Sequence, residues 1–368
     1  MEFSLTPEQH AVAALAEDLF GAHGSDDHVR AIAQAGATID MPLWRKLAET
    51  SLLDLAMPES DGGSGLGMLE LGLVLEQQGR FLAAAPLWQH QLAGLTIATH
   101  GKPALRQRVL PAIANGEQVA ALASECCAEQ GLRASRAANG WTLNGTLAAV
   151  LLDDVHTWLL APASTPAGVR LFLIPASQPG IHRTRGLLTD FQPVCDLTFD
   201  NAEVAADSDL DAAALDWLEP RIALCLSALQ LGVLAEALRR AAAYVSERHQ
   251  FGRPLGSFQA IAVRAADAYI EVELLRSALW QLAWRLDQDL PAIAAARVCK
   301  HQASQAGHLV SHTAQHFHGG VGADLQYPIH RFYLKSRALE MSGGGAEAQL
   351  ARIGRDLASE PWEQYLHE

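Results

Sequence analysis

The chain has 368 residues, 49% of them hydrophobic and 18% charged, so it can bury a large core and is expected to form two or three domains. Its formal net charge of −14 excludes nucleic acid and anionic membranes as general partners, although a local basic patch can still bind a phosphorylated ligand. Five cysteines without C-x-x-C spacing, no signal peptide and no apolar run of about 20 residues together predict a cytoplasmic protein without a membrane span.

Helical patterns dominate the first 117 residues. Thr6 and Gln9 form a capping-box pattern, and Pro7 occupies the first helical position between them. Further helices are predicted at residues 41–55, 68–79 and 83–100. The glycine-rich stretch that follows Pro58 lacks a preceding strand and a following Lys-Ser/Thr, so we interpret it as a turn and not as a phosphate loop. This part is predicted to be an N-terminal helical domain, residues 1–117.

From Gln118 the pattern changes to short apolar segments separated by turn signals such as Asn139-Gly140 and Asn144-Gly145. Strands are predicted at residues 141–143, 148–152, 157–161, 169–174 and 195–199. The adjacent Cys126 and Cys127 are interpreted as small packing residues. This part is predicted to be a middle β domain, residues 118–206.

The remainder, residues 207–368, is predicted to be helical after an acidic, alanine-rich linker at 207–216. Helices are expected at 219–248, 258–287, 291–317, 328–341 and 344–358. The fold class is therefore mostly α with a β insert.

The stretch 246–260, SERHQFGRPLGSFQA, joins two of these helices through a stiff turn. Its glycines supply unusual backbone angles and Pro254 stiffens the connection, so Arg248, Gln250 and Phe251 would project from a fixed platform. A fixed cation beside an aromatic ring suits a ligand that carries both a phosphate and a flat ring. The alternative is a helix–helix hinge whose arginine is solvated.

The segment RHQFGRPLGSFQA resembles the R-x-x-F-G-[RK]-x-[IL]-x-x-F-Q segment of the acyl-CoA dehydrogenase family. Residues 57–63 resemble the family's P-E-x-x-G-G turn, 110–123 its L-P-x-[IL]-x-x-G run, 315–322 its Q-x-x-G-G-x-G motif and 349–356 its terminal helix. The resemblance covers nearly the whole chain, in the family's order. It implies an N-terminal helical domain, a middle β-barrel-like domain and a C-terminal four-helix bundle, and the FAD-dependent α,β-dehydrogenation of an acyl-CoA thioester.

The resemblance also implies a carboxylate base that removes the α-proton, and here the matching position is Gly343, which cannot take a proton. Some relatives place the glutamate in the region that matches 222–229, which holds no carboxylate. Glu219 and Glu236 flank that region, with Glu219 at the edge of the predicted range, before the helix proper, and Glu236 further along the helix. Glu347, one helical turn after Gly343, is the remaining candidate for the base. The alternative for Glu347 is a first-turn glutamate favoured by the helix dipole.

In the family, the β domain and C-terminal helices of one subunit mainly hold the flavin ring, and a neighbouring subunit's C-terminal domain clasps the pyrophosphate and adenine. The ring-side elements are degraded here. The T-E-x-x-x-G-S-like loop survives only as Ser124-Glu125, and in LAAVL, residues 147–151, alanine replaces an aromatic residue and leucine a hydroxyl residue. The clasp is kept. Its expected FAD-binding residues are Arg248, Gln250, Phe251, Gln315, Gly319 and Gly320.

This asymmetry favours a subunit that completes the flavin site of a catalytic partner, as in the family's heterotetramers for the breakdown of steroid side chains. Electron-transferring flavoprotein is the acceptor that the resemblance implies. Two alternatives remain open: a self-sufficient divergent dehydrogenase with a relocated base, as a homotetramer, and a non-enzymatic scaffold.

A further alternative rests on histidines. His308, His312 and His316 recur every four residues on one helix face, with His318 close behind, and two histidines at that spacing can bind zinc. Because no H-E-x-x-H or carboxylate cluster completes a site, a packed or hydrogen-bonded stripe is the preferred interpretation, and no metal is expected.

Overall fold

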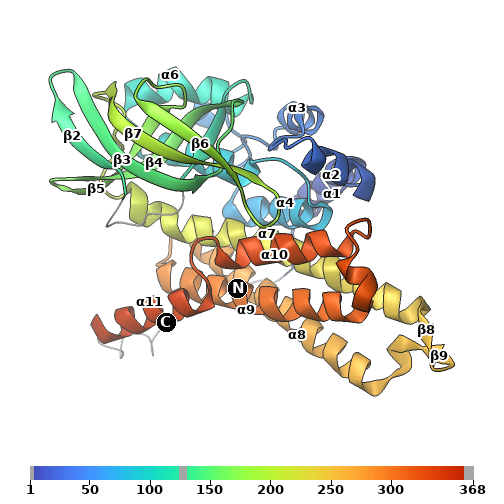
Figure 1. Ribbon diagram of the computed structural model, residues 1–368. Coiled ribbons are helices and arrows are strands. Elements are labelled where there is room, and N and C mark those ends of the chain that lie inside the picture. The colour runs from blue at the N-terminus through green and yellow to red at the C-terminus, as the bar shows by residue number, and fades with distance from the viewer. Residues whose placement is uncertain (1–3, 124–130, 360–368) are drawn as a thin grey trace. The chain divides into compact units, whose positions relative to one another are not determined.

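The computed structural model describes residues 4–123 and 131–359, which form helices, then a seven-stranded sheet, then helices again along the chain (Figure 1). Ser124-Glu125 and the pair Cys126 and Cys127 lie outside the described residues. The chain divides into two compact units. One comprises Ala14–Leu71 and Ala83–Ile222, and the other comprises the described residues of Met1–Ala13, Gly72–Leu82 and Ala223–Glu368.

Several helices precede the sheet, and the first three begin at side-chain caps. The helices before the sheet are α1 (Pro7–His23), α2 (Asp26–Gln34), α3 (Met41–Glu49), α4 (Met68–Phe81), α5 (Leu87–His100) and α6 (Pro103–Ala114). The capping box at the start of α1 is confirmed, because the backbone N–H of Thr6 donates to the Gln9 side chain at 2.9 Å and that of Gln9 donates to the Thr6 hydroxyl at 3.2 Å. Ser25 and Asp40 cap α2 and α3 with their side chains.

Several helix boundaries in this part differ from the prediction. Helix α3 ends at Glu49, earlier than the predicted residue 55, because the backbone turns left-handed at Ser51 (φ 56°). Helix α5 begins at Leu87 and not at residue 83, since Pro86 disfavours helical geometry in the residue before it. Helices α2 and α6 were not predicted. The glycine-rich stretch is a turn, as predicted, with a short 3₁₀ helix at Glu59–Asp61 that ends at left-handed Gly62.

The sheet has the strand order β1-β4-β2-β3-β7-β6, with β5 paired to β4. Its strands are β1 (Val119–Leu122), β2 (Arg133–Ala137), β3 (Gly140–Val150), β4 (His156–Thr165), β5 (Gly168–Pro175), β6 (Ile181–Leu187) and β7 (Pro193–Ala205). The pairing is antiparallel except where β4 meets β1 and β2. The inward residues form one apolar core, in which the rings of Trp141 and Phe172 meet edge to face at 5.2 Å. The predicted barrel-like insert is thus a curled sheet (Figure 1).

The turn predicted at Asn144-Gly145 was wrong. Strand β3 runs through it, so the predicted strands 141–143 and 148–152 are parts of one strand. The pairing with β7 shifts register between Leu143 and Gly145, which marks a β-bulge. Gly145 has φ 125°, and a Cβ there would lie 2.6 Å from the carbonyl oxygen of Gly131. The dipeptide therefore serves a bulge and a close backbone approach, which the same residues signal as readily as a turn.

The acidic stretch predicted as a linker is held by ion pairs. Its aspartates pair with basic side chains as follows: Asp207 with Arg108, Asp209 with Lys102 and Arg170, and Asp211 with His100. The Asp211 side chain also accepts from the N–H of Ala213, so it starts the next helix. That helix, α7 (Ala214–Glu247), therefore begins earlier than predicted, and Glu219 lies inside it and not before it.

The second half of α7 packs with the other C-terminal helices, whose predicted ranges are confirmed to within a few residues. These are α8 (Gln259–Asp287), α9 (Ile293–His318), α10 (Ile329–Met341) and α11 (Ala346–Ser359), and α9 contacts the other three. The backbones of α4 and α7 approach closely at Gly79 and Gly232, where an added Cβ would fall 2.3 Å from the Leu229 carbonyl oxygen and 1.8 Å from the Glu76 carbonyl oxygen.

Helix α7 also passes a length and composition test for crossing a membrane, with a mean hydropathy of 1.6 over its most apolar 18 residues. Because 78% of this stretch is buried inside the molecule, it has the surroundings of a core helix.

Candidate functional site

The connection between α7 and α8 is a tight hairpin. Strand β8 (His249–Gln250) pairs with β9 (Arg253–Pro254) across a two-residue turn. Phe251 and Gly252 both have positive φ, 54° and 79°, as a type I′ turn requires. A bulky residue with positive φ is uncommon and typically costs about 1–3 kcal/mol, and such strain gathers at functional sites. The Phe251 ring is 89% exposed, so the turn presents it to solvent.

Arg248 stands where α7 ends. Its N–H donates to the Tyr244 carbonyl at 2.9 Å, and its carbonyl accepts from Leu255 at 2.8 Å, so the backbone is fixed on both sides. Within the described ranges, no hydrogen-bond or ion-pair partner is found for its exposed guanidinium. In a chain with 41 acidic and 27 basic residues, an unengaged arginine is available for an anionic ligand.

An aromatic stack joins the ends of α7 and α9. The rings of Tyr244 and His318 stack with their centroids 4.4 Å apart and their planes 26° apart, and the centroid of the Tyr327 ring lies 5.3 Å from that of His318. Arg248 comes one turn after Tyr244, and Gly319 directly follows His318. The stack therefore brings together the two sequence motifs that were predicted to share one ligand.

The end of α9 combines an open glycine backbone with buried polar atoms. Gly319 has φ 57°, and no atom of residues 4–123 or 131–359 lies within 4 Å of a Cβ added at Gly319 or Gly320. Gln315 Oε1 and His318 Nε2 are buried, and neither has a hydrogen-bond partner among the described residues. An open backbone, two unsatisfied polar atoms and a nearby cation suit the adenine and pyrophosphate of FAD.

The position predicted for the base is a glycine turn between α10 and α11. Gly343 and Gly344 have φ 71° and 93°, and Gln349 Nε2 donates to the Gly343 carbonyl at 2.9 Å. A Cβ added at Gly343 would meet Leu226 at 3.0 Å and the Lys300 side chain at 3.8 Å. Lys300 is buried and donates to the Ser304 hydroxyl and the Glu340 carbonyl. Neither Leu226 nor Lys300, the described residues that a Cβ at Gly343 would meet, carries a carboxylate, and the carboxylate of nearby Glu340 pairs with Arg337.

The other carboxylates considered as bases are held elsewhere. Glu236 is buried between Arg239 and Arg240, with contacts of 2.7–2.8 Å. Burial raises its pKa, but the two guanidinium groups outweigh burial and hold the pKa below its usual range. Glu347 lies exposed in the first turn of α11, where a carboxylate complements the helix dipole.

The segment that matches the flavin-ring contacts lies in β3 and just after it. Leu147 is buried in the sheet core, whereas Ala148 and Ala149 are exposed and carry only methyl groups. Ala149 has φ 51°, and its N–H is already bonded to Asp196 Oδ1 at 2.8 Å. Residues 147–151 therefore present neither an aromatic face nor a hydroxyl to a ring.

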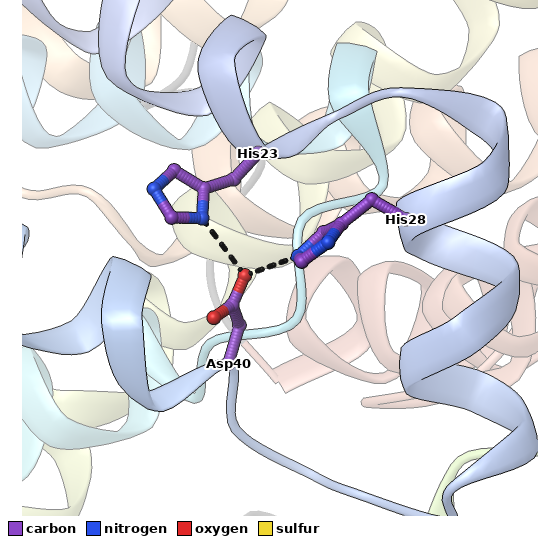
Figure 2. Close-up of side chains that lie close together, drawn as sticks. All are labelled: His23, His28 and Asp40. Carbon is purple, nitrogen blue, oxygen red and sulfur yellow. Dashed lines mark hydrogen bonds and ion pairs between the residues drawn. The ribbon is translucent and has the colours of Figure 1, made fainter.

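The histidine stripe on α9 is engaged in other contacts. The rings of His308 and His312 lie 4.5 Å apart, His308 Nδ1 lies 2.8 Å from Arg337, and His312 packs edge to face on Tyr333. Among the described residues, the group with suitable ligand atoms for a metal is instead His23, His28 and Asp40 (Figure 2). Their irregular spacing gave no sequence signal.

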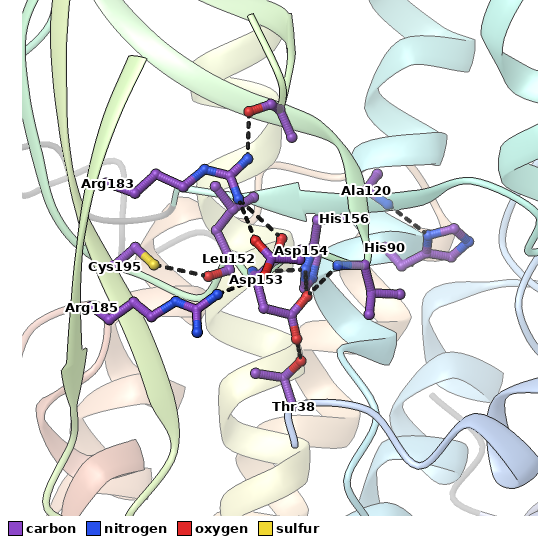
Figure 3. A network of polar contacts seen from close by, with 12 residues as sticks. Thr38, His90, Ala120, Leu152, Asp153, Asp154, His156, Arg183, Arg185 and Cys195 are labelled. Atoms are coloured by element: carbon purple, nitrogen blue, oxygen red, sulfur yellow. Dashed lines mark hydrogen bonds and ion pairs between the residues drawn. The ribbon is translucent and has the colours of Figure 1, made fainter. Parts of the chain in front are cut away.

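A second polar network, also not predicted, lies where β3 connects to β4 (Figure 3). Asp153 accepts from the Thr38 hydroxyl and contacts His156 Nδ1 at 2.7 Å. Burial raises the pKa of Asp153, but the bonds from His156 and Thr38 outweigh it and lower the pKa to about 2. Beside the network, Arg183 and Arg185 pair with Asp154 at the wall of a pocket of about 490 Å³.

The fold and these motifs define a known class of flavoenzyme. Residues 6–117 match the family model described as "Acyl-CoA dehydrogenase, N-terminal domain", and residues 220–358 match "Acyl-CoA dehydrogenase, C-terminal domain". The chain belongs to the acyl-CoA dehydrogenase family, FAD-dependent oxidoreductases that act on the CH–CH bond of an acyl-CoA thioester.

Among its relatives, the chain is 36% identical to the acyl-CoA dehydrogenase FadE27 of Mycobacterium tuberculosis, over 98% of this chain and 100% of that protein. It superposes with a TM-score of 0.94 and 37% identity on a chain of the ChsE4-ChsE5 complex from Mycobacterium tuberculosis, which covers 98% of this chain and 100% of the other. A chain from a variant of the Tcur3481-Tcur3483 steroid acyl-CoA dehydrogenase gives a TM-score of 0.91 at 39% identity, over 96% and 98% of the two chains.

Proposed function

We propose that this chain is the base-lacking subunit of a heteromeric acyl-CoA dehydrogenase and completes the flavin site of a catalytic partner. The observation that carries the proposal is the contrast between two regions of the chain. Within the part of the chain that the structure describes, the turn at Gly343 offers no carboxylate, whereas the ends of α7 and α9 present an unengaged arginine, an open glycine backbone and unsatisfied polar atoms.

Each residue of the second region has a specific role in this proposal. Arg248 provides a bidentate fork for the pyrophosphate, with Gln250 and Phe251 beside it on the hairpin. Gln315 and the backbone at Gly319 and Gly320 receive the adenine end, where the absence of side chains allows close approach. When bound, FAD accepts the hydride from the β-carbon of the substrate. The proton acceptor is supplied by the partner chain.

Exposed apolar side chains support assembly with other chains. Val263, Ile270 and Leu274 recur on one face of α8 and are each about half exposed, as are Leu350 and Leu357 on α11. Such stripes mark protein–protein contacts in a protein of this size. We propose a heterotetramer in the cytoplasm that acts on a steroid side-chain acyl-CoA, and the relatives named for a complex and for a steroid acyl-CoA dehydrogenase support the heteromer and the steroid class. The proposed electron acceptor is electron-transferring flavoprotein.

The test is the flavin content of the purified chain, measured from its visible absorption alone and after co-expression with a catalytic acyl-CoA dehydrogenase chain from the same source. We expect colourless protein alone and bound FAD in the complex. In the complex, Arg248→Ala should weaken FAD binding about 10–100-fold, because a charge-assisted bond to phosphate contributes about 1.5–3 kcal/mol. Arg45→Ala, at an exposed arginine of α3, should leave the FAD content unchanged and serves as the control.

Near-stoichiometric FAD in the chain purified alone would contradict the partner proposal and favour a self-sufficient dehydrogenase. In that case Glu347→Gln should abolish dehydrogenation if Glu347 is the base. Full flavin content and activity in an Arg248→Ala complex would instead indicate a scaffold without a cofactor role.

A further inference from the structure

The N-terminal helices contain a compact group of two imidazoles and one carboxylate (Figure 2). His28 Nε2 lies 2.6 Å and His23 Nδ1 lies 3.0 Å from the same oxygen, Oδ2 of Asp40. The three residues come from three places: the last residue of α1, the first turn of α2 and the N-cap of α3. Nitrogen and oxygen atoms from separate segments therefore converge on one point.

Asp40 is the buried member of the group, with 2% of its surface exposed, while His23 and His28 are 20% and 39% exposed. Its Oδ1 accepts from the N–H of Leu43 at 3.3 Å, as an N-cap does. In the described part of the chain, its ion-pair partners are these two imidazoles. A buried carboxylate is costly unless a positive charge or several donors compensate it, and here the compensation depends on groups that are also metal ligands.

We propose that His23, His28 and Asp40 bind a divalent transition-metal ion, with Zn²⁺ as the preferred ion. Two imidazole nitrogens and a carboxylate oxygen suit Zn²⁺ and exclude a preference for Ca²⁺ or Mg²⁺, which favour oxygen ligands. The candidate ligand atoms all lie within 4.8 Å of one another. The proposed function does not use these three residues.

The geometry requires a small adjustment. Zn²⁺ bonds of about 2.0–2.1 Å in a tetrahedron place neighbouring ligand atoms about 3.3 Å apart. The present nitrogen–oxygen distances, 2.6 and 3.0 Å, are those of hydrogen bonds and would have to widen by about 0.7 and about 0.3 Å to reach that separation. His28 can supply this movement, because its side chain is partly exposed and α2 is a nine-residue helix without buried residues.

Metal binding also changes which imidazole nitrogens carry a hydrogen. Each nitrogen that now points at Asp40 must offer its lone pair, so its hydrogen moves to the other ring nitrogen or leaves to solvent. Because both rings are partly exposed, water can solvate the other nitrogens. The exposure also rises from Asp40 outward to His28, so a water molecule can occupy the fourth position on the open side. The ion would then join the end of α1, the start of α2 and the start of α3.

The experiment measures Zn²⁺ binding by competition with a chromophoric chelator, on the full chain stripped of metal, in the oligomeric form in which it purifies. The test variant is His23→Gln with His28→Gln, because glutamine can still donate to Asp40 and keep the fold. The control is His312→Gln with His316→Gln, a histidine pair at helical spacing on α9. We expect one Zn²⁺ per chain in the wild type and the control, and an affinity at least about 100-fold lower in the test variant, since losing even an outer-shell partner costs about 10–100-fold.

Thermal unfolding is the second measurement. Zn²⁺ should raise the Tm of the wild type and the control, and it should leave the Tm of the test variant unchanged, because an ion bound only to the folded state stabilises it. Equal affinity and an equal Tm increase in the test variant would overturn the proposal, as would loss of binding in the α9 control. Wild-type protein that binds no stoichiometric Zn²⁺ would also overturn it. These measurements do not involve flavin, so they fail independently of the proposed function.

Discussion

His90 is completely buried, and its two ring nitrogens have opposite roles. Nε2 lies 3.0 Å from the Ile113 carbonyl, to which it donates, and Nδ1 accepts from the N–H of Ala120 at 3.2 Å. A proton added at Nδ1 would face that N–H. Burial lowers the pKa of His90 to about 4, reinforced by nearby His156 and opposed by the bond to Ile113.

This arrangement predicts a loss of stability in mild acid. In the unfolded chain His90 takes up its proton near pH 6.5, and in the folded chain near pH 4, so the unfolded state binds more protons between these values. The free energy of unfolding should therefore fall as pH decreases from 6.5 to 4, by about 3 kcal/mol from this residue at about 1.4 kcal/mol per pH unit. Urea unfolding of the wild type and of His90→Gln at pH 7, 5 and 4 measures the difference. The same pH dependence in both proteins would contradict it.

Individual residues also show which contacts can be predicted from the sequence and which cannot. The motif around Arg248 was enough to predict an exposed cation and ring on a stiff turn, because glycine and proline fix the backbone locally. The stack of Tyr244, His318 and Tyr327 was missed, since its members are far apart in sequence and only packing brings them together. The group at Asp40 was missed for the same reason. The FAD-binding assignments of the six residues stay predictions.

At the scale of elements, the stretch between β7 and α7 shows how buried ion pairs can anchor a segment whose composition is that of a linker. Asp209 is 1% exposed, and its carboxylate receives Lys102, Arg170 and the Trp141 indole N–H. Burial raises its pKa, but these partners outweigh burial and lower the pKa. The stretch is therefore anchored to the sheet, although its composition resembles that of a linker.

Asp209→Asn should destabilise the chain by about 3 kcal/mol, the lower end of the range for removing one partner of a buried ion pair, because Lys102 and Arg170 are partly exposed and can be solvated. Asp200→Asn, at an exposed aspartate of β7, should change stability by less than about 0.5 kcal/mol. Denaturant unfolding of both variants makes the comparison. Equal stability of the two would show that the ion pairs do not anchor the stretch.

Other elements were predictable to different degrees. The long C-terminal helices were found because apolar periodicity over many residues outweighs local ambiguity. The division of β3 at Asn144-Gly145 failed because a bulge and a turn use the same residues. Helix α6 was missed although Pro103 stands at its first position, because Pro111 lies inside it and disguises the pattern. The domain boundaries after residues 117 and 206 stay predictions.

At the scale of the whole molecule, the exposed stripe on α8 sets an expectation for assembly. Among the apolar residues of α8, the structure buries Leu275 and leaves Ile270 and Leu274 about half exposed. Periodicity identifies an apolar face without saying whether the chain itself or another chain covers it.

Ile270→Glu with Leu274→Glu should therefore reduce the mass of the oligomer, measured by light scattering after gel filtration, while circular dichroism shows unchanged helix content. Ala31→Glu adds the same kind of charge to an exposed position of α2 and should leave the mass unchanged. An intact oligomer in the α8 variant would show that this stripe does not hold the subunits together.

The turn at Gly343 also bears on the history of such a subunit. Gly343 adopts φ 71°, and a side chain there would meet Leu226 at 3.0 Å. A left-handed backbone costs a residue other than glycine roughly 1–2 kcal/mol. Under the proposed function, restoring the base by a single Gly343→Glu change would therefore also bring backbone strain and a close contact with Leu226. Independence from the partner would then require further changes around the turn, so the proposed loss of the base is difficult to reverse in evolution.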